Sequence, residues 1–169
     1  MCLLNIVEWI RDNAGGYFPI PSTQDVGTGD EELGEDSPLQ FCRMWLYMHH
    51  IYSKTKRRNI LSLAGELDLT GFCLPGKPGV VCVEGEGRRA KEFYSILRRW
   101  NWKSITCRKK EVVSNGDIHS LRRIDGFQEL AFDTHGQRQT HMDMGQFLEY
   151  LREHKLEYMF KTLFGVDGR

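Results

Sequence analysis

The stretch FCRMWLYMHHIY at residues 41–52 decides the fold of this chain. Its aromatic residues favour a β-strand, although its methionines and leucine would also fit a helix. Because successive side chains of a strand point to opposite faces, Met44, Leu46 and Met48 would face one layer of the protein. The opposite face would then carry a row of aromatic and basic residues: Arg43, Trp45, Tyr47 and His49.

Helical and extended patterns alternate downstream of this strand. The spacing of apolar residues predicts one helix over 54–68 and another over 90–100. Two strands joined by a Pro/Gly turn are predicted within 71–85, and residues 103–109 alternate as a last strand. This order predicts the α+β class, and specifically a ferredoxin-like β-α-β-β-α-β sandwich whose antiparallel strands carry both helices on one face.

An extra strand and further helices are expected after this unit. Residues 114–125 have the polar composition of a loop, and residues 127–132 predict an extra C-terminal strand. Two apolar stripes within 144–164 predict two helices, with Asp143 as the N-cap and Gly165 as the stop signal.

Charge divides the chain into an acidic N-terminal part and a basic remainder. The net charge of the 169 residues is zero, yet residues 1–38 hold one basic and eight acidic residues. Apolar residues at helical spacing predict a short helix over 1–13, and the Gly-, Pro- and acid-rich segment 14–38 is typical of a linker. The division predicts one folded domain over 39–169, which is long enough to bury a core without disulfides.

Cysteine usage and hydropathy place the chain among intracellular proteins. Its five cysteines are scattered without a C-x-x-C pair, which argues against a disulfide framework and a structural zinc site. The N-terminal apolar run lacks a basic flank and contains Glu8, so a signal peptide is not expected, and no membrane contact is either. We expect a cytoplasmic or nuclear protein with no metal or cofactor.

Two phosphate-binding patterns follow the strand predicted at 80–84, and neither is favoured. Cys82 and Arg88 have the spacing of a cysteine phosphatase loop, but Glu84 and Glu86 within that loop would repel a phosphate. The glycines of 83–90 match a dinucleotide-binding fingerprint, but the chain lacks the further parallel βα units that such a fold requires. A nucleotide-dependent enzyme therefore stays a remote alternative.

Basic residues are concentrated around the predicted sheet. Residues 40–125 hold 17 basic and 8 acidic residues. An aromatic sheet face with a basic rim is how one common module binds single-stranded RNA. The candidate RNA-binding residues are Trp45, Tyr47, His49, Lys54, Lys56, Arg57, Arg58, Lys77, Arg108, Lys109 and His141. In the alternative, Trp45 and Tyr47 are covered by the C-terminal helices and form a second core.

Several blocks of the sequence resemble a known family. The blocks Met44–Tyr52, Gly71–Gly85, Asn101–Lys103, His141–Phe147 and Leu163–Gly165 look like the C-terminal half of the RWD domain-containing protein 2 family. That half is similar to the C-terminal domain of the spliceosomal factor Prp3. The resemblance implies a ferredoxin-like domain that contacts small nuclear RNA. It points to the His49-His50 pair, to Lys77 in its Gly-Pro turn, and to His141 with Asp143 as matching positions.

The N-terminal residues resemble the last helix of an RWD domain, a protein-interaction fold. The rest of such a domain would precede residue 1, so the chain resembles a truncated or alternatively started isoform. We expect a non-enzymatic module that binds single-stranded or structured RNA. A protein-protein adaptor that uses the N-terminal helix and the C-terminal helices is the alternative.

Overall fold

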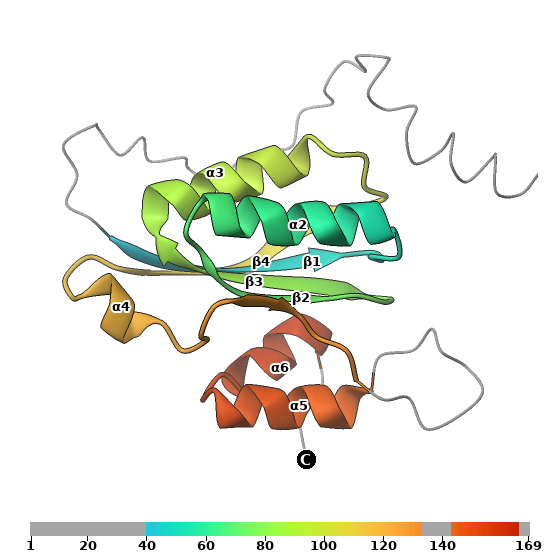
Figure 1. The fold of residues 1–169 in the computed structure, drawn as a ribbon. Helices are drawn as coiled ribbons and strands as arrows, with labels where there is room; N and C mark the ends of the chain where they lie inside the picture. Colours follow the sequence, from blue (N-terminus) through green and yellow to red (C-terminus); the bar gives the residue numbers. More distant parts are fainter. Residues whose placement is uncertain (1–39, 133–142, 166–169) are drawn as a thin grey trace, which may run out of the picture.

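A computed structural model of the chain describes residues 40–132 and 143–165 (Figure 1). The helix expected over 1–13, the acidic segment 14–38 and His141 lie outside the described residues. Within the described part, no helix combines the length and the apolar character that crossing a bilayer requires.

The described strands form one sheet in the order β4-β1-β3-β2-β5. The strands are β1 (Phe41–Met48), β2 (Thr70–Leu74), β3 (Gly79–Glu86), β4 (Ile105–Val113) and β5 (Phe127–Glu129). Neighbours among the first four strands pair antiparallel, whereas β5 pairs parallel to β2. The ferredoxin-like unit and its extra strand are confirmed.

Helices cover both faces of this sheet (Figure 1). On one face lie α2 (Lys54–Glu66) and α3 (Gly87–Arg98), and on the other lie α5 (Met144–Glu153) and α6 (Tyr158–Phe164). The polar segment after β4 contains a short helix, α4 (Ile118–Leu121), where the sequence predicted only a loop. The element order is therefore as expected, but the second sheet face is occupied.

The first core lies between the sheet and the helices α2 and α3. The hydroxyl of Ser53 accepts a hydrogen bond from the backbone N–H of Lys56 and caps α2. The helix then buries Ile60 and Ala64 at the spacing of one helical turn. The alternate apolar residues of β1 face this core, as the sequence predicts: Met44, Leu46 and Met48.

The second core lies between the sheet and the helices α5 and α6. Asp143 caps α5 through its side chain, and Gly165 ends α6 in the left-handed conformation with φ of 69°, so both predicted signals are confirmed. Trp45 and Phe72 meet edge to face with ring centroids 5.9 Å apart, and Phe72 meets Phe147 at 5.7 Å.

The prediction of Trp45 as part of an open stacking face is wrong. The residue is 0% exposed, because the apolar stripes of α5 and α6 have to be buried and this face of the sheet is where they pack. Tyr47 packs against the edge of the same core and stays half-buried. The second-core alternative therefore describes this face.

A buried ion pair connects the sheet to the segment after β4. The Arg43 Nε donates to Glu84 Oε1 at 2.5 Å, and its Nη2 donates to the Leu121 carbonyl at 3.1 Å. The other carboxylate oxygen of Glu84 accepts from the backbone N–H groups of Arg123 at 2.9 Å and Ile124 at 3.1 Å. Burial opposes the charge on Arg43, but the Glu84 carboxylate outweighs this effect and raises the pKa of the guanidinium.

Glu111 extends this network to α6. It accepts a hydrogen bond from Arg43 Nη1 at 3.2 Å and another from the Tyr158 hydroxyl at 2.8 Å. Partial burial opposes ionisation of Glu111, but these two donors prevail and lower the pKa of its carboxyl. Strands β1, β3 and β4 and the last helix are therefore held by one set of charged hydrogen bonds.

The burial of Trp45 predicts that its truncation destabilises the domain. Trp45→Ala should lower the free energy of unfolding by about 3–5 kcal/mol, because it leaves a cavity in the second core. Trp45→Phe should cost much less, since the indole N–H has no hydrogen-bond partner among the described residues. Urea denaturation measures both.

Tyr52→Ala is the matched control for that experiment. The Tyr52 ring is 50% exposed, so its loss should change the free energy of unfolding by less than about 1 kcal/mol. A Trp45→Ala protein as stable as the Tyr52→Ala protein would contradict the second core.

Candidate nucleic-acid interface

Aromatic and basic side chains gather where β1 ends. The Arg108 guanidinium lies over the Tyr47 ring, 4.4 Å from its centroid. Beyond the strand, the rings of His50 and Tyr52 stack with centroids 4.9 Å apart and planes at 18°. His49 meets His50 edge to face at 5.3 Å. Four rings from a short stretch of chain thus lie at one end of the sheet.

The loop between α3 and β4 adds two tryptophans to this end. Trp100 and Trp102 stack with centroids 6.2 Å apart, and the indole N–H of Trp102 donates to the Leu97 carbonyl at 2.8 Å. The Lys56 ammonium lies 4.6 Å from the centroid of the Trp102 ring. Both indoles are half-buried and so keep part of their surface exposed to solvent.

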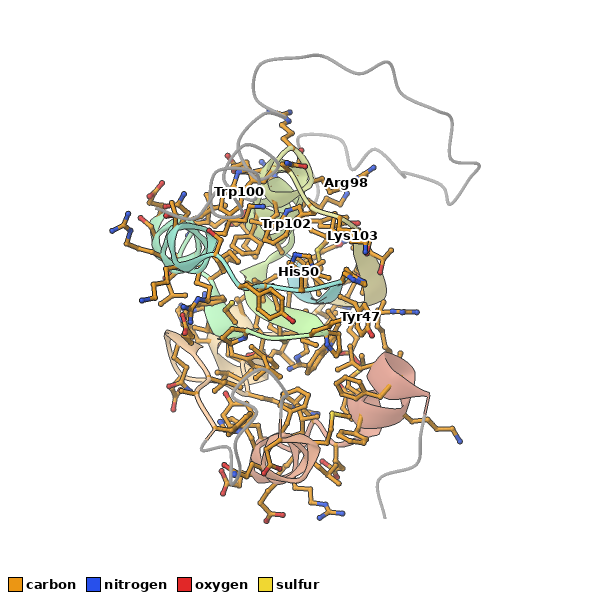
Figure 2. All side chains as sticks on the ribbon, turned by 90° about the vertical axis from the view of Figure 1, so that its right-hand side faces the viewer. Tyr47, His50, Arg98, Trp100, Trp102 and Lys103 are labelled. Carbon is orange, nitrogen blue, oxygen red and sulfur yellow. The ribbon has the colours of Figure 1, made fainter. Side chains whose placement is uncertain are left out.

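Figure 2 shows how these side chains follow one another. The labelled aromatic residues run from Trp100 and Trp102 through His50 to Tyr47, with Arg98 and Lys103 beside them. We call this surface the cationic-aromatic end. It comprises Tyr47, His49, His50, Tyr52, Lys56, Lys77, Arg98, Trp100, Trp102, Lys103 and Arg108.

The electrostatics of this end favour an anion. Loss of solvation lowers the pKa of His49, and the positive charges of Lys103, Lys77 and His50 lower it further. The charged groups that act on this imidazole are thus all cationic. A phosphate placed among them would relieve their mutual repulsion.

The remaining predicted residues are distributed around the sheet. Lys54 and Arg58 are exposed on α2. Arg57 is ion-paired with Glu129, and Lys109 lies 3.7 Å from Glu111. Arg57 and Lys109 are thus engaged by carboxylates, whereas Tyr47, His49, Lys56, Lys77 and Arg108 are brought together at the cationic-aromatic end.

Sequence reasoning did not include the tryptophans among the candidate site residues. Trp100 lies in the helical pattern predicted over 90–100, and Trp102 lies in the block Asn101–Lys103, which carries part of the family resemblance. The available signal was the motif WNWK at 100–103, in which two aromatic residues alternate with polar ones next to a lysine.

The two phosphate-binding patterns do not form phosphate sites. Cys82 is wholly buried in the second core, where burial and then the Glu84 carboxylate raise the pKa of its thiol. Residues 83–86 continue β3 and pair with β1, so they form neither a phosphatase cradle nor a dinucleotide loop. This geometry does not suit a thiolate nucleophile.

A pocket of about 340 Å³ lies at the opposite end of the sheet, near the N-terminus of α3. Its two arginines are held by carboxylates: Arg89 lies 3.3 Å and Arg122 lies 3.4 Å from Asp68. Glu86 binds Arg89 as well, at 3.1 Å. An anionic ligand would have to displace these carboxylates, so the cationic-aromatic end is the better candidate.

The cationic surroundings of His49 predict its titration. An NMR titration should give His49 a pKa below 6.5, the usual value for histidine. In a Lys77→Gln/Lys103→Gln protein this pKa should rise, because two repelling charges are removed. Arg152→Gln is the matched control, since Arg152 pairs with Glu149 on α5 and is not among the charges that act on His49. An unchanged His49 titration would contradict the described electrostatics.

Known proteins are similar to part of this chain in sequence or in structure. A protein of a fungal species (strain ATCC 74256), the phomoidride biosynthesis cluster protein F, is 27% identical over 110 residues, which are 65% of this chain and 36% of that protein. The chain thus spans about a third of this curated relative. An acylphosphatase from Coxiella burnetii has 14% identity and a TM-score of 0.40 over 54% of this chain and 94% of its own.

A second solved structure resembles the same part of the fold. An acylphosphatase from Bacillus subtilis has 11% identity and a TM-score of 0.38, covering 54% of this chain and 99% of its own. The family described as the C-terminal domain of the small nuclear ribonucleoprotein Prp3 matches residues 44–163. This match runs from within β1 to within α6. The chain therefore belongs to the Prp3 C-terminal domain family.

Proposed function

We propose that this chain is a non-enzymatic RNA-binding module and that unpaired RNA contacts its cationic-aromatic end. Phosphates are neutralised by the cations of that end, and bases stack on its partly exposed rings. The ligand is single-stranded RNA or an unpaired segment next to a duplex, because bases have to leave their own stack to reach aromatic side chains.

The proposal rests on the cation-π contacts at the cationic-aromatic end. Arg108 lies over Tyr47 and Lys56 lies over Trp102, each within 5 Å of the ring centroid. Single-stranded nucleic acids are bound by this combination, in which base stacking contributes ~1–3 kcal/mol per base and the cations follow the backbone. The stacked pair of His50 and Tyr52 offers a further platform.

Family membership supports RNA as the ligand class. The family is named for a small nuclear ribonucleoprotein, a name that implies association with RNA. The more specific relationship, to the RWD domain-containing protein 2 family, is part of this proposal and rests on the resemblance of blocks such as Met44–Tyr52 and Gly71–Gly85.

A protein-protein adaptor is less well supported. Such an adaptor would use the apolar faces of the C-terminal helices, but α5 and α6 bury Phe147, Leu151, Met159 and Leu163 against the sheet. An enzyme is less well supported too, since the raised pKa of Cys82 disfavours the thiolate that a phosphatase would need.

Removal of rings from the cationic-aromatic end should weaken RNA binding. In a titration of short fluorescent RNAs, the His50→Ala/Tyr52→Ala protein should bind at least about fivefold more weakly, because a stacking platform is lost. Tyr52 is 50% exposed, so the variant should stay folded, which circular dichroism checks.

Removal of a cation gives the second part of the same test. Arg108→Gln should weaken binding and reduce the salt dependence by ~0.7 in the slope of log K against log salt, as expected for one lost phosphate contact. Arg152→Gln on α5 is the matched control, since Arg152 is an exposed arginine paired with Glu149 outside the site. Equal behaviour of the two arginine variants, or no RNA binding by the parent chain at 50 mM salt, would contradict the proposal.

A further inference from the structure

Strand β4 forms a long, exposed edge of the sheet. It is the outermost strand of the order β4-β1-β3-β2-β5, and on its outer side none of the described elements pairs with it. It has nine residues, and two of its valines are well exposed: Val112 is 46% exposed and Val113 is 37% exposed. An edge of this length and exposure offers a surface on which an extended segment can lie.

Three consecutive basic residues determine what this edge accepts. Arg108, Lys109 and Lys110 are all exposed. On the face that α6 covers, Arg108 lies over the Tyr47 ring and Lys109 lies over the Tyr158 ring. Lys110 belongs to the other face, because it pairs with Met44, whose side chain faces the first core. Positive charge therefore lies on both faces of the edge. It repels a second copy of the same strand and attracts an acidic segment.

The chain itself has an acidic segment before β1 in the sequence. Residues 25–36 contain six acidic residues and no basic ones: Asp25, Asp30, Glu31, Glu32, Glu35 and Asp36. The chain enters β1 at Phe41, which pairs with Val113 at the end of β4. The described part of the chain therefore begins next to the end of β4.

The length of chain between this start and the acidic residues matches the distance to the basic ones. Residues 30–36 precede residue 40 by four to ten positions, which span up to ~13–36 Å when extended. Lys110 and Arg108 lie three and five positions from Val113, or ~10–17 Å along the strand. A tether this short gives an effective concentration in the millimolar range.

We propose that residues 25–36 dock along the exposed edge of β4, with their carboxylates beside Arg108, Lys109 and Lys110. The docked segment covers Arg108, which belongs to the cationic-aromatic end. Its consequence for RNA rests on the proposed function: the segment competes with RNA for that end. The docking itself does not depend on RNA binding.

Zero-length cross-linking of the full chain tests the docking directly. A carbodiimide joins carboxylates to lysine amines in contact, and mass spectrometry locates the products. We expect intramolecular links from residues 30–36 to Lys109 and Lys110. The yield of these links should fall more than tenfold at 1 M salt, because the contact is electrostatic. A Lys109→Arg/Lys110→Arg protein keeps the charges but loses the acceptors, so it should lose these links. Links spread equally over Lys54, Lys91 and Lys155, or no links to β4, would overturn the proposal.

RNA titration tests the competition separately. Neutralising the segment with Asp30→Asn, Glu31→Gln, Glu32→Gln, Glu35→Gln and Asp36→Asn should tighten RNA binding about three- to tenfold at 50 mM salt, with little difference at 0.5 M salt. Specific cross-links with unchanged RNA affinity would support docking and overturn the competition. If the parent chain does not bind RNA, the cross-links alone decide the docking, and the proposed function fails independently.

Discussion

The burial of Trp45 under the C-terminal helices is the constraint on which the rest of the structure depends. A ferredoxin-like sheet with helices on one face leaves its other face open, but here α5 and α6 cover that face and bury Trp45 completely. The sheet thus separates two apolar cores. The domain becomes a three-layer structure in which helices cover both faces of the sheet (Figure 1).

The charged network around Glu84 fixes how this third layer is attached. Arg43 and Glu84 form an ion pair on the second face, and Glu84 also accepts two backbone hydrogen bonds from the segment that leads to β5. Removing one partner of such a pair is costly, because it leaves the other charge buried without compensation. The network thus holds the chain after β4 where α5 and α6 can close over Trp45.

The sequence predicted the element order because each segment has a clear apolar period. It also predicted the two faces of β1, since alternation assigns Met44 and Trp45 to opposite sides. It could not decide whether the second face is open, because that depends on where α5 packs, as in the contact between Phe72 and Phe147, which are 75 residues apart. Trp100 and Trp102 were missed as site residues for a related reason: they become neighbours of Lys56 and His50 only when α3, β4 and β1 meet at one end of the sheet.

We propose that RNA binds at the end of the sheet and not on its face. Photo-cross-linking of the full chain to a short RNA that contains 5-iodouridine, followed by mass spectrometry of the adducts, tests this claim most directly. The account predicts adducts on the aromatic residues of the cationic-aromatic end, chiefly Tyr52 and Trp102, where rings are accessible beside cations. Adducts on Tyr150 or Phe164 of the C-terminal helices, with none at the cationic-aromatic end, would contradict it.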